Sequence, residues 1–466
     1  MVQRCLPMMG QLPQQQNALF YDFCLEKHIP HDHLLRQIDQ FLDFDSFKEH
    51  LKPHYSHTGR PSIDPELMIR MLLLGYCYGI RSERRLCEEV HFNLAYRWFC
   101  KLGLEDDVPD HSSFSKNRHG RFRESDLFRL IFDSVVHSCH KEGLIKAEGF
   151  ASDASYIRAD AAWENSVFTE DEFECRRRNS RAVNEYLDSL DEKPLQVATP
   201  KRISLTDPIA RWKKKGGPAR FYYSTNYLID IANNIIVDVE ATPSNNILEV
   251  DSTRLMIERV EQKLSIKPKR LMADTAYGTG PMLDWLVQEK QIEPYIPVWD
   301  KADQNPETFS LKDFKFDKEK NRYICPAGKE LTHGRRKFKN GKTASVTKAS
   351  TMIYRAYKPD CDACKYKMQC TPTDNARKIA RSIYEESREI TRKIIESEKY
   401  AQSFKDRRKV EVLFGHLKRI MKLDRLRLRG LTGASDEFIL AATAQNLKKL
   451  AQQRFKPPDH RIAAPA

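Results

Sequence analysis

The chain has 466 residues, with 78 Lys and Arg against 65 Asp and Glu, so its formal net charge is +13 at pH 7. This length exceeds one ordinary domain and allows a large buried core without disulfide bonds. No stretch of the sequence approaches the roughly 20 consecutive apolar residues of a membrane-spanning helix, which argues against a helical membrane protein.

The excess positive charge favours a polyanionic partner, with nucleic acid as the first candidate and ordinary solubility charge as the alternative. The N-terminal stretch "MVQRCLPMMGQLPQQQ" lacks an apolar core followed by a small-residue cleavage site, so we expect a cytoplasmic protein rather than a secreted one. Eleven cysteines are an odd number for a disulfide framework. In a reducing compartment, clustered cysteines more often hold a metal than pair with each other.

Residues 1–145 have a helical pattern. In "DPELMIRMLLLGYCYGI", Asp64 and Pro65 provide a cap and a first-turn residue, and apolar residues follow at helical spacing. Several short helices with polar turns, the last of them basic and carrying Arg118 and Arg121, favour a DNA-binding module of the helix-turn-helix kind. A structural or dimerisation domain made only of helices is the alternative.

Residues 146–298 predict a mixed sheet. The segment "EGFASDASYIRA" alternates as a strand does, and two strand-like runs meet at the hairpin pair Asn233 and Asn234. A helix, the strand "KRLMADTAYG", another helix and a last strand follow. Between them, residues 164–217 are highly charged and poor in aliphatic residues, which predicts a loop or insertion.

The remainder completes an α+β fold, in which a helical N-terminal domain precedes a mixed β-sheet core flanked by helices. Residues 299–376 break the rhythm of the core and form a cysteine-bearing insertion. Residues 377–450 predict the C-terminal helices of the core, beginning near Arg377, and residues 451–466 form a tail.

Two aspartates on the predicted sheet need an explanation. Asp274 ends an apolar strand, where a charged carboxylate is tolerated only if it is hydrated, hydrogen-bonded or bound to a metal. Asp153 lies in the first strand, 274 − 153 = 121 residues earlier. If the two strands are neighbours, both carboxylates project into one cleft, where they repel each other unless a divalent cation neutralises them. Asp160 is the main rival of Asp153 in this role.

A third carboxylate lies in "SFKDRRKVEVLFGHLKRIMK". At about 100° per residue, Arg407, Glu411 and Lys418 fall together with Phe404 within a stripe of about 60° on one helix face. Asp406 points to another side of the same helix. The alternative is that this stripe is an ordinary solvated helix face.

These residues together resemble a known family. The segments "ASDAS" and "MADTAYG" and the helix Phe404-x2-Arg407-x3-Glu411-x6-Lys418 are similar to the three acidic blocks of bacterial DDE insertion-sequence transposases, whose catalytic core has an RNase H-like fold. Phe404 stands where the family signature has Tyr. The segments "GRPSIDPELMIRMLLLGYCYGIRSERRLCEEV" and "PDHSSFSKNR" also resemble the helical N-terminal domain of one branch of these enzymes.

The resemblance implies that Asp153, Asp274 and Glu411 hold two Mg²⁺ or Mn²⁺ ions and catalyse cleavage and strand transfer of the element ends. Arg407 and Lys418 would then bind DNA phosphates beside the metals. The implied partners are terminal inverted repeats, target DNA and a second copy in the synaptic complex, in the bacterial cytoplasm with the nucleoid. Two alternatives stay open, an RNase H-like nuclease without strand transfer and a catalytically silent DNA-binding protein.

The cysteine-bearing insertion contains Cys361-x2-Cys364-x5-Cys370, with Cys325 standing 36 residues before Cys361. Four thiolates with one tight pair can close a tetrahedral structural Zn²⁺ site. An iron–sulfur cluster and reduced, unligated thiols are the alternatives.

Two further features are candidates for DNA contact. Trp299 follows the last predicted core strand and could stack on a base displaced from DNA, with a partly buried hinge residue as the alternative. In "LDRLRLRG", Arg425, Arg427 and Arg429 alternate with leucines, which suits phosphate contact or an ordinary solvated face.

Overall fold

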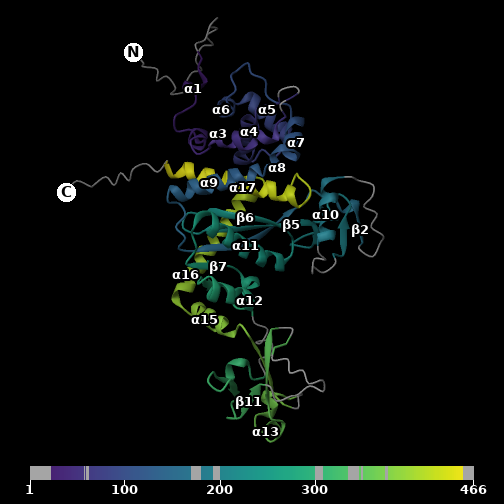
Figure 1. Ribbon diagram of the computed structural model, residues 1–466, viewed down its shortest axis with the longest axis vertical. Coiled ribbons are helices and arrows are strands. Elements are labelled where there is room, and N and C mark those ends of the chain that lie inside the picture. The colour runs from purple at the N-terminus through teal and green to yellow at the C-terminus, as the bar shows by residue number, and fades with distance from the viewer. Residues whose placement is uncertain are drawn as a thin grey trace, which may run out of the picture.

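The structure of the protein is a computed structural model. It describes residues 23–56, 58, 62–168, 180–192, 200–299, 308–333, 346–347, 350–372 and 376–454. Parts of the expected charged loop and of the cysteine-bearing insertion, and most of the expected tail, lie outside these ranges. Figure 1 shows the N-terminal helices at one end of an elongated molecule, a sheet in the middle and a small second sheet at the other end.

The N-terminal module is made of short helices, as expected. They are α1 (Leu25–His28), α2 (Leu34–Asp39), α3 (Phe44–Leu51), α4 (Pro65–Tyr78), α5 (Glu83–Phe92), α6 (Leu94–Phe99), α7 (Ser112–His119), α8 (Arg121–Glu124) and α9 (Leu127–Lys141). Helix α4 starts where the sequence predicts, because the Asp64 side chain accepts a hydrogen bond from Glu66 N at 2.8 Å and Pro65 takes the first position. It is buried over most of its length and forms the centre of the module.

The central sheet is mixed. Its strands are β1 (Phe150–Arg158), β4 (Arg211–Lys213), β5 (Arg220–Asp230), β6 (Ile235–Pro243), β7 (Arg270–Met272) and β8 (Glu293–Tyr295). Strand β5 pairs antiparallel with β1, β4 and β6, whereas β7 runs parallel to β1 and β8 runs parallel to β7. The hairpin between β5 and β6 turns at Asn234, whose φ of 57° is tolerated by Asn. The expected α+β class is confirmed.

Helices cover both faces of this sheet. Successive strand residues point to opposite faces, and Ser152 contacts Thr253 of α11 (Asn246–Leu264) through their hydroxyls at 2.6 Å. On the other face, Tyr227 of β5 stacks on Phe414 of α16 (Glu398–Arg419), with ring centroids 5.4 Å apart. The connection from β7 to β8 contains η4 (Thr275–Tyr277), α12 (Gly280–Asp284) and the π-helical turn η5 (Trp285–Glu289).

The last helix, α17 (Leu431–Arg454), lies between the N-terminal module and the central sheet (Figure 1). The buried Asn446 side chain accepts a hydrogen bond from Ile236 N and donates one to Ile236 O, so it satisfies the outer edge of β6 as a further strand would. On the opposite side, Arg81 of the N-terminal module forms a buried ion pair with Glu437. One continuous hydrophobic core therefore includes both the module and the sheet.

The expected loop at residues 164–217 differs from the structure in its described parts. They contain η2 (Trp163–Asn165), β2 (Ser166–Phe168), α10 (Arg181–Glu192), β3 (Arg202–Ser204) and β4. Helix α10 is strongly amphipathic and buries only small apolar residues, Ala182 and Val183, within the described chain. Because this apolar stripe is narrow and the segment is highly charged, the sequence resembles a loop. The stripe is nevertheless sufficient to pack one helix against the protein.

The insertion forms a small antiparallel sheet of its own in the order β13-β12-β11-β10-β9. Its elements are β9 (Lys315–Asp317), β10 (Arg322–Ile324), β11 (Glu330–His333), β12 (Thr351–Ala356), α13 (Lys358–Asp362), α14 (Lys367–Cys370) and β13 (Lys378–Ser382). The helical region expected from about Arg377 thus begins later, at α15 (Glu385–Ile395). The reason is Ile379, which is buried in the aromatic core of the insertion and holds β13 on β12.

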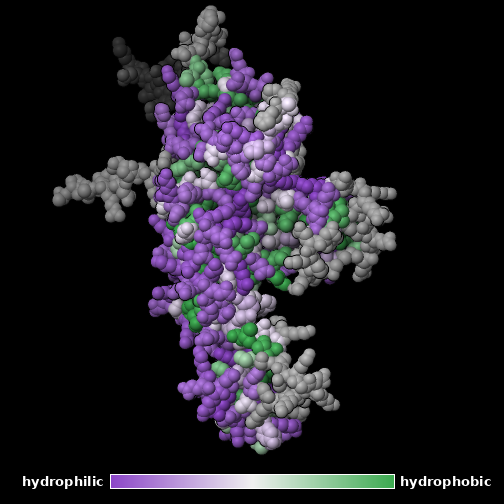
Figure 2. Space-filling view, in the orientation of Figure 1, coloured by the Kyte–Doolittle hydropathy of each residue, from purple (hydrophilic) through white to green (hydrophobic). Residues whose placement is uncertain are grey.

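The visible face of the molecule in Figure 2 is mostly hydrophilic, as expected from the charged composition. Among the helices that the structure describes, none is long and apolar enough to cross a membrane.

Candidate active site

Asp153 lies in the middle of β1, directly opposite Tyr227 of β5. Its side chain is half-buried, and one carboxylate oxygen accepts a hydrogen bond from Ala154 N at 2.8 Å. Because Tyr227 stacks on Phe414, the face of the sheet that carries Asp153 is the face that α16 covers. The strand therefore presents this carboxylate to the helix that carries Glu411.

Asp274 lies two residues beyond the end of β7, the parallel neighbour of β1. The register pairs Phe150 with Leu271, an offset of 271 − 150 = 121 residues. The offset between Asp153 and Asp274 is the same, 274 − 153 = 121, so the two residues stand level on adjacent strand paths. The Asp274 side chain also caps η4, since it accepts a hydrogen bond from Ala276 N at 2.8 Å. This hydrogen bond from the backbone helps to stabilise a charged carboxylate at the end of a buried strand.

The third carboxylate reaches the same place from α16. The pKa of Asp153 is raised to about 6, chiefly by burial and also by the negative charges of Asp274 and Glu411. The Ala154 N–H and the positive charge of Arg407 oppose this rise in the pKa of Asp153. Asp274, Glu411 and Arg407 thus all act on Asp153, although these residues come from β1, the end of β7 and α16. The structure brings together the acidic residues that the sequence singles out.

Lys418 also lies close to these carboxylates. Its ammonium donates a hydrogen bond to Tyr156 O at 3.2 Å, three residues along β1 from Asp153. Burial lowers the pKa of Lys418, whereas the negative charge of Asp153 raises it. Arg407 and Lys418 therefore bracket Glu411 on the helix face that the sequence predicts.

The two rival carboxylates are engaged elsewhere. Asp160 accepts hydrogen bonds from Arg425 at 2.8 Å and from Arg429 at 3.0 Å. Asp406 is buried on another side of α16, beside Arg270 of β7 at 3.7 Å. Their ion pairs account for both residues without a metal.

Two family models match the chain. A transposase domain (DUF772) matches residues 23–120, and a transposase DDE domain matches residues 324–451. The chain is a DDE transposase of the insertion-sequence kind. No curated protein shows a significant match to it. The second match includes α16 with Arg407, Glu411 and Lys418, whereas Asp153 and Asp274 lie before it.

In the described ranges of the transposase, no group of three or more His, Cys, Asp or Glu side chains is placed to hold a metal ion. The other three cysteines of the insertion nevertheless lie near enough to Cys370 to influence its pKa. Burial raises the pKa of Cys370, Arg377 opposes this, and the three other cysteines raise it again. These are Cys325, Cys361 and Cys364.

Trp299 lies close to Asp274, because its backbone N–H donates to Gly278 O at 2.9 Å. The indole is 53% exposed and lines an open cavity of about 600 Å³, together with Ala276 and Val250. The predicted aromatic residue therefore lies against the turn that follows Asp274 and lines a largely apolar cavity.

The N-terminal arginines have structural partners. Arg118 is only 7% exposed and forms an ion pair with Glu83 at 2.7 Å. Arg121 lies over the ring of Tyr55, with its guanidinium carbon 4.2 Å from the ring centroid. Arg118 is thus explained by packing inside the module, whereas Arg121 remains half-buried at its surface.

Sequence reasoning missed Glu249 and Tyr277. Glu249 is buried on α11 and accepts a hydrogen bond from Ser224 at 2.7 Å. Burial raises the pKa of Tyr277, and the charges of Glu249, Asp153 and Asp274 act in the same direction. The Tyr277 phenol is therefore buried within reach of the charges of Asp153, Asp274 and Glu249. Glu249 lies one turn after the start of α11, where acidic residues are common, so the sequence does not indicate that it is buried near Tyr277.

Proposed function

We propose that the transposase cuts and joins the ends of its element at Asp153, Asp274 and Glu411, with two Mg²⁺ or Mn²⁺ ions held among them. The observation that carries this proposal is the register of β1 and β7, which sets Asp153 and Asp274 level on adjacent parallel strands. The raised pKa of Asp153, to which burial and both other carboxylates contribute, supports it. Such a set is unfavourable by itself and is relieved by a divalent cation. The chemistry of the three oxygen donors fits a hard cation that keeps water and substrate oxygens as its other ligands.

The charges around Asp153 support the same view. Asp274 and Glu411 lie near enough to Asp153 to raise its pKa, although the described structure contains no group of three such side chains placed to hold an ion. Uncompensated carboxylates repel each other, so a cation would be expected to draw them together. When bound, such ions supply activation of a water or 3′-hydroxyl nucleophile and stabilisation of the leaving oxygen in an in-line displacement at phosphorus.

The chain's own residues orient the DNA in this mechanism. Arg407 offers a planar fork for a phosphate next to Asp153, and Lys418 offers a point charge held by Tyr156 O. Trp299 would receive a base displaced from the duplex, and its exposed ring at the rim of a cavity near the Asp274 turn supports this role. The proposal keeps Arg121 as the phosphate contact of the N-terminal module and gives Arg118 a structural role there.

The remaining assignments follow from the same proposal. The N-terminal helical module recognises the terminal inverted repeats, and two copies of the chain hold two ends in the synaptic complex. The four cysteines of the insertion would close a structural Zn²⁺ site, and the influence of the other three on the pKa of Cys370 supports this assignment. The protein acts in the bacterial cytoplasm on nucleoid DNA.

The proposal is tested with purified protein, Mg²⁺ or Mn²⁺, and a labelled DNA fragment that carries the ends of the element. Wild type should cleave the ends and join them to a target plasmid. Asp153→Asn, Asp274→Asn and Glu411→Gln should each lose at least about a hundredfold in both steps, since even an outer partner of a metal ligand typically costs 10–100-fold.

A joining assay with pre-cut ends separates the proposal from its alternatives. Cleavage by wild type without joining of pre-cut ends would identify a nuclease. Binding without either reaction would identify a silent DNA-binding protein. Activity that persists in Asp274→Asn would remove this residue from the mechanism.

A further inference from the structure

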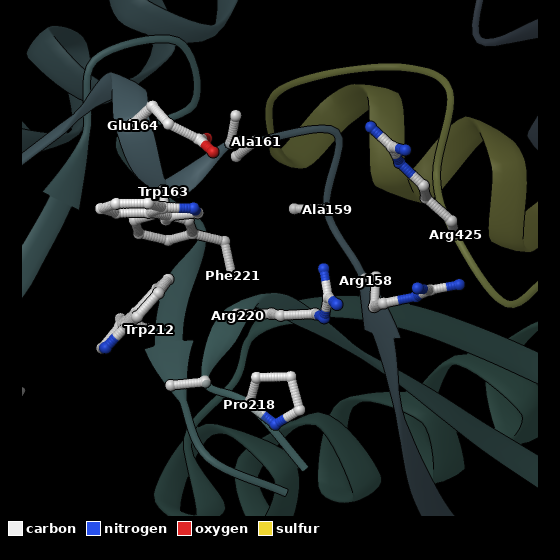
Figure 3. Close-up of a pocket in the computed structure, with 12 residues that line it drawn as sticks. Arg158, Ala159, Ala161, Trp163, Glu164, Trp212, Pro218, Arg220, Phe221 and Arg425 are labelled. Carbon is white, nitrogen blue, oxygen red and sulfur yellow. The ribbon is translucent and has the colours of Figure 1, made fainter.

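A second cavity lies at the far end of β1, away from the carboxylates. It has a volume of about 400 Å³ and lies between the end of the central sheet and the segment around η2. Figure 3 shows aromatic side chains on one side of it and arginines on the other. We call it the aromatic–arginine pocket, and its defining residues are Trp163, Trp212, Phe221, Arg158, Arg220 and Arg425.

One wall of the pocket consists of aromatic side chains, some packed on each other and one largely exposed. Trp212 packs on Phe221 with ring centroids 4.9 Å apart, which fixes the back of the wall. Trp163 stands in front of it and is 60% exposed. A large aromatic side chain that is left so exposed beside a cavity is typical of a surface that receives a ligand.

The opposite wall is cationic. Within the part of the chain that the structure describes, Arg220 is exposed and has no ion-pair partner. Arg158 pairs with Asp424 and Arg425 pairs with Asp160, but the side chains of both arginines are 40% or more exposed. Exposed ion pairs contribute little to stability, so either arginine can bind a phosphate in place of its carboxylate partner.

We propose that the aromatic–arginine pocket binds an unpaired nucleotide of the DNA substrate, outside the carboxylate cleft. The base stacks on the free face of Trp163, and the flanking phosphate is held by Arg220. An aromatic platform beside a cationic groove is the general chemistry of single-strand recognition, and it does not depend on base sequence. The inference rests on the proposed function only for the position of the cleft.

The distance along β1 places this nucleotide relative to the chemistry. Asp153 and Arg158 are five residues apart on one strand, or about 17 Å at about 3.3 Å per residue. Phosphates of one duplex strand repeat about every 3.4 Å, so this span is about five nucleotide steps. The pocket is therefore too far from the carboxylates to hold the base next to the scissile phosphate, where Trp299 stands.

The test uses full-length protein without divalent ions and measures fluorescence anisotropy of an oligo(dT) strand of about 20 nucleotides and of a duplex of equal length. Trp163→Ala should bind oligo(dT) roughly 5- to 150-fold more weakly, the range for loss of one stacked base, while its duplex affinity stays within about twofold. Trp163→Phe should retain most of the affinity. Phe92→Ala removes another exposed aromatic, on α5, and should bind as wild type does.

Arg220→Ala adds an independent measurement. It should make the slope of log K against log salt shallower by about 0.7 for oligo(dT), as expected for one lost phosphate contact, whereas Trp163→Ala should leave the slope unchanged. Wild-type affinity of Trp163→Ala for oligo(dT), or an equal loss on duplex and single strand, would overturn the inference. These binding measurements need neither divalent ions nor turnover, so a failure of the catalytic proposal remains distinguishable from a failure here.

Discussion

Gly278 ends the turn that starts at Asp274, and the backbone of residues 297–299 lies directly against it. A Cβ at Gly278 would stand 1.9 Å from Pro297 O and 2.9 Å from Trp299 N. Ordinary contact begins at 3.4 Å, so Gly278→Ala must separate the two backbone segments by about 3.4 − 1.9 = 1.5 Å. Both atoms belong to the backbone, and neither can rotate away as a side chain could.

Overpacking of this kind typically costs about 1–3 kcal/mol of stability. A displacement of about 1 Å near a reaction centre can reduce the rate about a hundredfold. We therefore expect Gly278→Ala to lower the free energy of unfolding by about 1–3 kcal/mol in urea titrations. Strand transfer per folded molecule should fall by about a hundredfold, because Asp274 and Trp299 move apart.

Gly415→Ala is the matched control. A Cβ at Gly415 meets nothing within 4 Å, and Ala is favoured over Gly inside a helix such as α16 by about 0.5–1 kcal/mol. This variant should be slightly more stable than wild type and retain strand transfer. If Gly278→Ala joined DNA at the wild-type rate, the close approach of residues 297–299 to the Asp274 turn would have no functional importance, and our reasoning on Trp299 would fail.

Three further predictions concern stability and the choice of carboxylate. Asn446→Ala removes two buried hydrogen bonds to Ile236 and should cost about 2–6 kcal/mol in urea unfolding, at about 1–3 kcal/mol for each orphaned group; a loss below 1 kcal/mol would contradict the edge-strand role. Burial raises the pKa of Asp207 from 3.8 to about 6, so the folded state binds this proton more tightly than the unfolded state. The Asp207 contribution to the unfolding free energy should therefore fall by about 3 kcal/mol as the pH rises from about 4 to about 6, and Asp207→Asn should abolish this part of the slope. Asp160→Asn should keep cleavage within about tenfold of wild type while Asp153→Asn loses it, and equal losses would make Asp160 a ligand.

The parts of the site that sequence reasoning found are those with strong local patterns. The strand before Asp274 and the helix stripe around Glu411 each have a period that fixes which face carries the carboxylate. The hairpin at Asn233 and Asn234 follows from two strand-like runs with a turn pair between them. The equal offset of 121 residues then appears only when the parallel register of β1 and β7 is known.

Features that depend on distant segments were not predictable. Helix α17 links the N-terminal module to the sheet through Glu437 and Asn446, and neither residue differs in sequence from an ordinary polar helix position. Strand β13 has only five residues and gains its conformation from pairing with β12, so local propensity does not reveal it. Glu249 is similar, since its buried carboxylate accepts a hydrogen bond from Ser224 of β5, a contact between helix and sheet that local sequence does not show.

Metal binding tests the central claim most directly, because it needs neither the element ends nor turnover. Titration of the full chain with Mn²⁺, with the free ion followed by electron paramagnetic resonance, would compare wild type with Asp153→Asn, Asp274→Asn and Glu411→Gln. We expect each substitution to weaken Mn²⁺ binding at least about tenfold, with Asp160→Asn unchanged. If Glu411→Gln bound Mn²⁺ as tightly as wild type, α16 would not contribute to the metal site, and the three-carboxylate account would be contradicted.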